Sequence, residues 1–478
     1  MIDAQFAIFC DMVSSFLKSE FERAHNIPFL NFHHDLWTSD YGTQGVVGGS
    51  ACFIDHQWRF WTIALITTVD NGSHEACRLR RLMSDRIKEL YDLDIDAMAQ
   101  FTVSDTANAT KSKKVSRLFA ESVQTDCTIH VLNLCLNYGV GLRDNTESVY
   151  LVDPVTQLAR KKKRVCTPRG GFDESHKLMI KVRALNNYFS TPQRVNRLKE
   201  IQGYHGLPAL ETIDDGDTRV ATITTMFRRT ILNYPAFQQY FQPRSEQADS
   251  KDESSVFSSL TFSDWTLMLE MKAITNSLAL LALDGAQRKE QVASELIVVI
   301  KDAADSLDGE ALEVYQLDGR RSSATNEVNL PRVSIKFSDL TASGKKCASR
   351  TRAQVRKRLH GATPENVLIL LLDPRTKHSV RELLQFSDDE AAGDTNAPAS
   401  TCKPTPCTRT AKSKVMTETM VENVIESGTE LLLKAHREMY SAMYATKENT
   451  QNAAPVPSPA FDCVPSTTRK RAICGTRE

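Results

Sequence analysis

The sequence lacks the long apolar run that a membrane-spanning helix needs, because no stretch approaches roughly 18 residues. Its first residues also lack a basic segment followed by a small-residue cleavage site, so we expect no secretory signal. The chain carries no net charge, since 59 basic residues balance 59 acidic ones. That balance excludes a surface coated in positive potential and leaves nucleic-acid binding to local patches. We therefore expect a soluble, intracellular protein without membrane contact.

The cysteines lack a repeating spacing. Eleven of them are scattered over 478 residues, which favours reduced thiols over a disulfide framework. Cys127 and His130 are one helical turn apart, and such a pair supplies half of a zinc site. No second pair with zinc-finger spacing follows, so the default for this pair is helix packing or a polar contact. A chain of this length and composition can bury a sizeable core and form more than one domain.

Two apolar runs each deliver one carboxylate to a strand end. The stretch 28–38 has the pattern of a buried strand and carries Asp35, and the stretch 99–108 carries Asp105. Mg²⁺ and Mn²⁺ prefer carboxylate oxygens brought together from distant parts of a chain, so the two acids are candidate ligands of a divalent cation. The alternative is that each Asp only ends its strand at a turn, which Asp favours by bonding its own backbone.

The order of the predicted elements brings these two strands together. An amphipathic helix over 1–26 precedes the first strand, β-rich runs at 45–54 and 58–66 follow it, and a helix over 73–90 leads to the second Asp. A strand reached through a helix can lie parallel beside the first strand of a mixed sheet. We therefore expect Asp35 and Asp105 at neighbouring strand ends, with Cα atoms within about 8 Å.

In its motifs the chain resembles the RNase H-like transposases of the hAT superfamily. The matching stretches lie in family order over about three quarters of the chain. They are Asp-Leu-Trp-Thr-Ser at 35–39, Phe-Ile-Asp then Trp at 53–58, His74, Ser-Asp-Thr-Ala-Asn at 104–108, Cys-x-x-His-x-Leu-Asn-Leu at 127–134, Val182-Arg183, Tyr188-Phe189-Ser190, Pro192-Gln-Arg194, Thr218-Arg219 and Leu-Leu-Asp-Pro-Arg-Thr-Lys at 371–377. Trp37, Asn108, Cys127 and His130 belong to these motifs.

The resemblance implies an RNase H-like mixed α/β sheet with a large all-α insertion. It implies a core over 27–145, a helical insertion region over 175–385, and Asp35 and Asp105 as the first two acids of a catalytic three-carboxylate site. The third acid is not identified, because the family's Glu-Arg-x-Phe-Ser stretch, which belongs to its dimerising segment, is not found. The family's N-terminal zinc finger is not found either, so we expect a form truncated at both ends.

Two candidate replacements and one substitution bear on activity. Glu270 lies on a predicted helix that begins near Ser263, where an exposed Glu on the polar face is the expected interpretation. The glutamates of the predicted C-terminal helix are the other substitute acids. The family's Thr-Arg-Trp motif is Thr218-Arg219-Val220 here, and valine has no ring to stack on a base, so the roughly 1–3 kcal/mol of each such contact is lost.

Basic clusters are the predicted DNA contacts. One lies in an expected loop over 146–174, another lies in 345–358, and both can contact phosphates, act as nuclear import sequences or form solvated charged surfaces. Arg469-Lys-Arg471 is a further possible import sequence. The residues proposed to bind nucleic acid are Arg160, Lys161, Lys162, Lys163, Arg164, Arg219, Lys345, Lys346, Arg350, Arg352, Arg356, Lys357 and Arg358.

The C-terminal quarter is predicted as a linker over 386–412, an amphipathic helix over 413–446 and a disordered tail over 447–478. The apolar stripe of that helix fits docking on the body or self-association.

The function predicted from sequence is a transposase-derived, nuclear, nucleic-acid-binding protein that binds DNA weakly and without sequence preference and is catalytically inactive. One alternative is an active transposase that uses Mg²⁺ or Mn²⁺, and the other is a protein-interaction scaffold without DNA contact. The missing third carboxylate separates the first two, and salt-dependent DNA binding separates the first from the third.

Overall fold

The computed structural model describes most of the chain, in eleven stretches. They are residues 2–38, 44–72, 75–105, 122–152, 159–213, 221–242, 255–283, 292–317, 330–359, 362–384 and 418–451. The predicted linker over 386–412, most of the predicted tail, Asn108, Arg219 and the Thr218-Arg219-Val220 motif lie outside the described residues.

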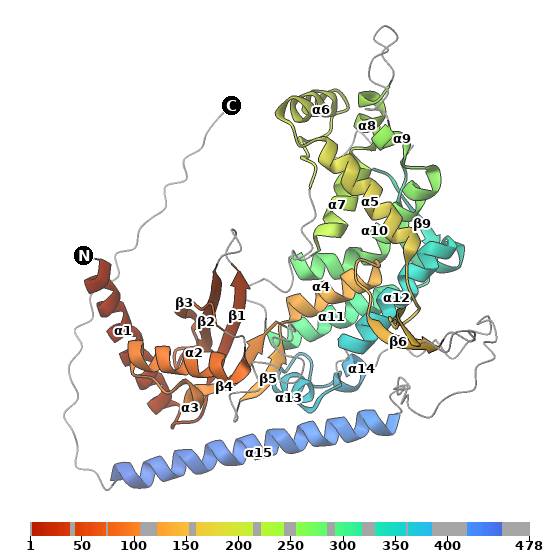
Figure 1. Ribbon diagram of the computed structural model, residues 1–478. Coiled ribbons are helices and arrows are strands. Elements are labelled where there is room, and N and C mark those ends of the chain that lie inside the picture. The colour runs from red at the N-terminus through yellow and green to blue at the C-terminus, as the bar shows by residue number, and fades with distance from the viewer. Residues whose placement is uncertain are drawn as a thin grey trace, which may run out of the picture.

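The N-terminal part is a five-stranded mixed sheet with helices on one face (Figure 1). The strand order is β3-β2-β1-β4-β5, in which β2 runs antiparallel to β1 and β3 while β4 runs parallel to β1 and β5. The predicted mixed α/β sheet is therefore confirmed. Its elements are α1 Ile2–Arg23, β1 Leu30–Thr38, β2 Gly45–Ile54, β3 Phe60–Val69, α2 Ala76–Tyr91, α3 Ile95–Met98, β4 Ala99–Ser104, β5 Val123–Asp126 and α4 Thr128–Gly139.

The core of this sheet unit forms because alternate residues of β1 point toward α1 and α2. Leu30 and Phe32 are fully buried there beside Leu17 of α1, as period-2 alternation requires. The phenol of Tyr91 on α2 donates a hydrogen bond to the Leu65 carbonyl of β3 at 2.8 Å. On α1, Val13 and Leu17 are buried, whereas Phe6, Phe9 and Met12 are exposed.

A two-stranded antiparallel ribbon follows α4, where we expected a loop. It consists of β6 Thr146–Val152 and β7 Ala159–Val165, and we call it the basic ribbon. The loop prediction was wrong because a lysine run has low intrinsic strand propensity, whereas pairing with the β-branched and aromatic residues of β6 decides the conformation.

The region beyond the ribbon is mainly helical, as expected. Its largest core surrounds α10, most of whose residues between Trp265 and Ala282 are buried. A small antiparallel pair, β8 with β9, adds strands that the prediction did not include. The elements are α5 Asp173–Tyr188, α6 Pro192–Tyr204, α7 Thr222–Leu232, α8 Tyr234–Tyr240, α9 Ser255–Ser258, α10 Phe262–Leu283, α11 Ala293–Asp308, β8 Ala311–Tyr315, β9 Arg332–Lys336, η3 Phe337–Asp339, α12 Ala342–Arg358, α13 Pro364–Leu372 and α14 Val380–Leu384.

Among the described helices, α10 has the length and composition of a membrane span, which the pattern of apolar runs in the sequence did not indicate. Yet 67% of its most apolar window is buried inside the fold. That burial is what the central helix of a core shows.

The predicted C-terminal helix is present as α15, Glu418–Gln451, and runs beneath α13 and α14 (Figure 1). It is longer at its end than expected, because residues 447–451 of the predicted tail are helical. Gly428 allows the close approach, since a Cβ atom there would lie 2.4 Å from the Cβ atom of Val367 on α13. The Arg381 guanidinium of α14 bonds Glu418 and Glu422. Farther along, Leu433, Met439 and Tyr440 are exposed.

Candidate functional site: two carboxylates at neighbouring strand ends

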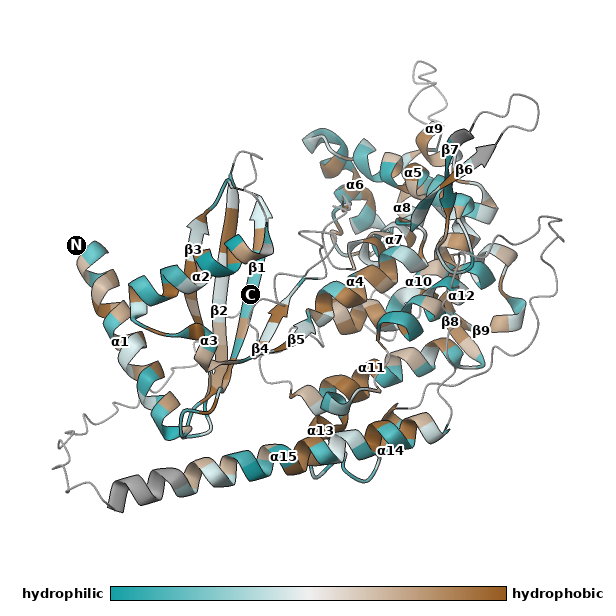
Figure 2. Ribbon diagram, turned by 60° about the horizontal axis from the view of Figure 1, so that its bottom comes forward, coloured by the Kyte–Doolittle hydropathy of each residue, from teal (hydrophilic) through white to brown (hydrophobic). Residues whose placement is uncertain are grey.

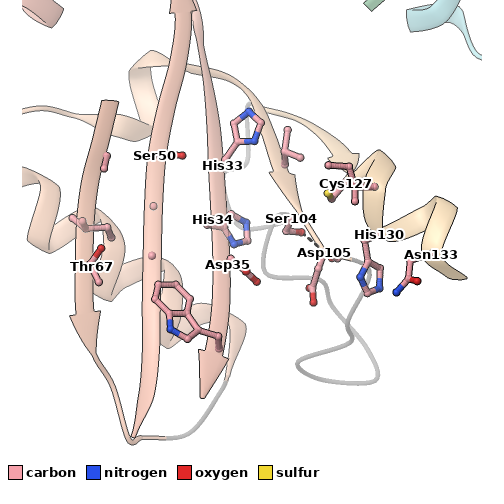
Figure 3. A pocket seen from close by; sticks show the side chains of 17 residues that line it. His33, His34, Asp35, Ser50, Thr67, Ser104, Asp105, Cys127, His130 and Asn133 are labelled. Carbon is pink, nitrogen blue, oxygen red and sulfur yellow. Dashed lines mark hydrogen bonds between the residues drawn. The ribbon is translucent and has the colours of Figure 1, made fainter. Parts of the chain in front are cut away.

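The parallel pairing of β1 with β4 brings Asp35 beside Asp105. The register runs up to His33 opposite Val103. Asp35 lies two residues farther along β1, which continues to Thr38, and Asp105 directly follows the last residue of β4. Asp35 points away from the buried face that holds Phe32. Figure 3 shows the two carboxylates on the same side of the sheet. The predicted adjacency is therefore confirmed, and it depends on the helix α2 that separates the two strands in sequence.

Both carboxylates line an open pocket of about 510 Å³ on the uncovered face of the sheet. Gly48 lies opposite Asp35 in the β1–β2 register, and the Trp37 ring occupies the space above it, since a Cβ on Gly48 would meet that ring at 2.7 Å. The lining residues are His33, His34, Asp35, Trp37, Gly48, Gly49, Ser50, Ala64, Ile66, Thr67, Val103, Ser104, Asp105, Cys127, Ile129, His130 and Asn133.

Burial and a neighbouring carboxylate dominate the electrostatics of Asp35. Partial burial raises its pKa and the nearby Asp105 charge raises it further, whereas a hydrogen bond from the Leu36 N–H at 2.8 Å and the nearby His130 lower it. The net shift is upward. Two like charges at neighbouring strand ends repel each other, and a divalent cation between them would relieve that repulsion.

Histidines surround the pair, and sequence reasoning singled out only one of them. His130 on α4, singled out from sequence only as a motif residue, lines the pocket, and burial lowers its pKa although Asp105 acts in the opposite direction. His34 is buried, and within the described residues its Nε2 atom has no hydrogen-bond partner. Burial and then the charge of His33 lower the pKa of His34 to about 4. The position of His33 and His34 next to Asp35 in the strand was the available indication.

The donor set fits a hard cation. Carboxylate oxygens are the ligands Mg²⁺ and Mn²⁺ prefer, and Mg²⁺ usually keeps several waters beside one or two carboxylates. Within the described residues, however, no three His, Cys, Asp or Glu side chains come together as a metal-binding group. Cys127 precedes α4 without capping it and lines the pocket with His130, so the pair stays short of a zinc site there.

Neither kind of substitute acid contacts the aspartate pair. Glu270 is buried rather than exposed, which corrects our expectation, and its carboxylate accepts hydrogen bonds from the N–H and hydroxyl of Thr341 at 2.8 and 2.5 Å. On α15, Glu418 and Glu422 bond Arg381 instead.

The basic residues of α12, proposed from the sequence to bind nucleic acid, are in part engaged inside the fold. Arg350 is fully buried, and it donates to the Tyr138 carbonyl at 2.7 and 3.1 Å, to the Asp144 carboxylate at 3.0 Å and to the Gly170 carbonyl. Its partners lie about 200 positions away in sequence, so local charge patterning could not reveal them. The assignment of Arg350 to nucleic-acid binding was wrong.

Arg352 and Arg356 are also engaged inside the fold. Arg352 donates to the Leu307 carbonyl at 2.6 Å, and both guanidinium groups contact Asp308 of α11, at 3.0 and 3.3 Å. They hold α11 against α12, which corrects their predicted role. The remaining cations of the cluster are peripheral, with Lys345 and Lys357 exposed, Lys346 over the Phe172 ring and Arg358 over the Tyr138 ring.

The basic run on β7 is better placed to meet a ligand. The side chains of Lys161, Lys162, Lys163 and Arg164 are all exposed. Arg160 is on the same strand. Figure 2 shows β6 and β7 at the margin of the helical part.

No protein-family model matches this chain, and no curated protein is significantly similar to it.

Proposed function

We propose that this protein is derived from an RNase H-like hAT transposase and binds nucleic acid without cutting it. The observation that carries the proposal is the Asp35 and Asp105 pair on adjacent parallel strands. A sheet order of β3-β2-β1-β4-β5 with β2 antiparallel supports the RNase H-like assignment, because the resemblance in the motifs implies this arrangement. The all-helical region after the sheet supports the family's insertion.

The chemistry of the pair is that of cation and phosphate binding. Asp35 and Asp105 would hold a Mg²⁺ or Mn²⁺ ion, which supplies positive charge to a phosphodiester. Phosphodiester cleavage generally requires the attacking and leaving oxygens to be held in line, and a misplacement of about 1 Å can cost on the order of 100-fold. Two carboxylates without a third in the described residues leave that positioning incomplete, which supports inactivity.

Cation binding is tested by thermal unfolding of the full chain with and without Mn²⁺. A ligand present at 100 times its dissociation constant stabilises the folded state by about 2.7 kcal/mol. We expect Mn²⁺ to raise the Tm of the unsubstituted chain and to leave the Asp35→Asn, Asp105→Asn variant unchanged. Equal shifts in both proteins would refute the cation site.

Activity is tested by incubating the same two proteins with Mn²⁺ and a labelled DNA duplex. We expect salt-dependent binding by both and cleavage by neither. Cleavage by the unsubstituted chain that the double variant lacks would instead establish the alternative, an active transposase. Absence of DNA binding at low salt would favour the scaffold alternative.

Two further parts of the proposal concern assembly and location. The exposed apolar residues of α15 support self-association, which light scattering of the full chain measures. The basic runs support a nuclear location, which fluorescent tagging tests.

A further inference from the structure

The basic ribbon extends from the protein with both of its faces exposed. Thr146, Glu147, Ser148 and Tyr150 of β6 are exposed, as are the residues from Lys161 to Val165 of β7. Apart from each other, β6 and β7 make no extensive contact with any described element. An isolated two-stranded ribbon is only marginally stable in water, so this one depends on its attachment.

Arg350 supplies that attachment. Its buried guanidinium bonds Asp144, just before β6, and the Gly170 carbonyl, just after β7. The Thr167 hydroxyl donates to Asp144 at 2.8 Å and accepts a hydrogen bond from the Asn145 N–H at 2.8 Å. Both ends of the ribbon are thus fixed to one buried side chain, which holds the strands out from the surface.

Cations outnumber carboxylates in the two strands of the ribbon. Strand β7 contains five cations and strand β6 one carboxylate, Glu147. Lys161, Lys162, Lys163 and Arg164 have no ion-pair or hydrogen-bond partner in the described part of the chain. Because successive strand residues point to opposite faces, Lys161 and Lys163 project on one side, and Lys162 and Arg164 on the other.

We propose that the basic ribbon enters the major groove of duplex DNA edge-on, so that each face meets the phosphates of one strand. The inference rests on the proposed nucleic-acid binding and adds the partner and the geometry. A β-layer with its side chains is about 10 Å thick, and the major groove is about 12 Å wide and admits a two-stranded ribbon. Tyr150 pairs with Lys161 in the register, where its hydroxyl can donate to a phosphate.

The two-faced distribution of charge distinguishes this partner from a flat anionic surface. A lipid headgroup layer contacts one face of a ribbon, so only one pair of cations would contribute to binding. A groove has two walls, so both pairs contribute. The Lys161→Gln, Lys163→Gln variant and the Lys162→Gln, Arg164→Gln variant therefore separate the two partners, and neither pair supports the core.

The experiment measures binding of the full chain to a fluorescent duplex by anisotropy over a range of salt. Each double variant should lower affinity by about tenfold and reduce the salt slope by roughly 1.8, since each lost phosphate contact reduces it by about 0.9. A control with the same charge change elsewhere, Lys88→Gln on α2 with Lys434→Gln on α15, should bind as the unsubstituted chain does. Circular dichroism confirms folding of every variant.

A second duplex tests the groove. Its cytosines carry glucosylated hydroxymethyl groups at C5, which fill the major groove, and the unsubstituted chain should bind it about tenfold more weakly, as the ribbon variants bind plain DNA. Binding by the unsubstituted chain with no effect of either pair would overturn the ribbon inference and leave the proposed nucleic-acid binding intact. An effect of one pair only, or tighter binding to phosphatidylserine vesicles than to duplex, would also overturn it. No duplex binding at all would overturn both.

Discussion

Arg350 is a fully buried charged side chain, and its surroundings explain how the fold tolerates it. Four hydrogen bonds to the Tyr138 and Gly170 carbonyls and to Asp144 satisfy a guanidinium that is 0% exposed. A buried charge of this kind is tolerated only when it is paired and hydrogen-bonded. Removing it takes the guanidinium donor away from two carbonyls and leaves the Asp144 carboxylate with the Thr167 hydroxyl as its remaining donor among the described residues.

Replacing Arg350 should therefore destabilise the fold strongly. We expect Arg350→Met to lower the free energy of unfolding by about 3 kcal/mol, because breaking a buried pair leaves its partners unsatisfied. Urea unfolding provides the measurement. Lys357→Met on the same helix is the control, since Lys357 is exposed and its loss should stay within about 0.5 kcal/mol. A similar loss of stability in both variants would contradict the structural role of Arg350.

His34 makes stability depend on pH. Its pKa is lowered from 6.5 to about 4 by burial and by the charge of His33, so the unfolded chain takes up the proton first as pH falls. The contribution of neutral His34 to stability is therefore fully present above pH 6.5, and it is lost as the pH falls from 6.5 to about 4, by about 3 kcal/mol at most. The His34→Gln variant should lose less stability over this interval in urea titrations. If the free energies of unfolding of both proteins decreased in parallel as the pH falls, this role of His34 would be refuted.

Single residues were the hardest part to predict. Asp35 and Asp105 could be placed together because strand and helix order alone dictates their adjacency. The roles of Arg350 and Glu270 could not, since their partners are fixed by contacts distant in sequence. His34 was missed although the alternation of β1, which buries Phe32, places His34 on the same buried face.

At the scale of elements, α10 and α12 are held together by a buried cap. Glu270 of α10 accepts from the Thr341 N–H and hydroxyl at the start of α12. The Glu270 carboxylate packs tightly against the first turn of α12, because a Cβ atom on Gly344 would collide with it. A negative charge at a helix N-terminus is also favourable to the helix dipole.

Removing this cap should cost more than removing an exposed acid. We expect Glu270→Ala to lower the free energy of unfolding by about 2 kcal/mol, as for hydrogen bonds to a charged group. The exposed Glu426 of α15 gives the matched control, and Glu426→Ala should change stability by less than about 0.5 kcal/mol. Thermal or urea unfolding measures both, and equal effects would show that the cap carries little energy.

Elements with a clear period were predictable and elements decided by pairing were not. The helices α10 and α15 and the strands β1 to β4 follow from their apolar periodicity. The basic ribbon does not, because five consecutive cations on β7 have no strand pattern. These residues form a strand because they pair with the neighbouring strand β6.

At the scale of the whole molecule, the described residues form two large hydrophobic cores and a small third one around α13 and α14. One large core joins α1, α2 and the sheet, from Cys10 to Ala99, and the other surrounds α10, from Val131 to Val355. The change from one core to the other falls between Ala99 of the sheet core and Val131 of α4, which packs in the helical core. Domains that each have their own hydrophobic core can unfold as separate units.

Calorimetry should therefore resolve two transitions. Leu17→Ala removes a fully buried side chain from the sheet core. It should lower the temperature of only one transition, because the free energy of unfolding of that unit falls by about 2–5 kcal/mol. Leu278→Ala does the same in the helical core and should lower the other. A single transition shifted equally by both substitutions would contradict the division into two units.

The position of α4 between these cores has a mechanical consequence. Its first turn carries His130 at the aspartate pocket, and its last turn carries Tyr138, whose carbonyl Arg350 holds together with both ends of the basic ribbon. At 1.5 Å per residue the two positions are about 12 Å apart along a stiff rod. A displacement of the ribbon would therefore act through the Arg350 guanidinium on the last turn of α4, whose first turn carries His130 at the pocket.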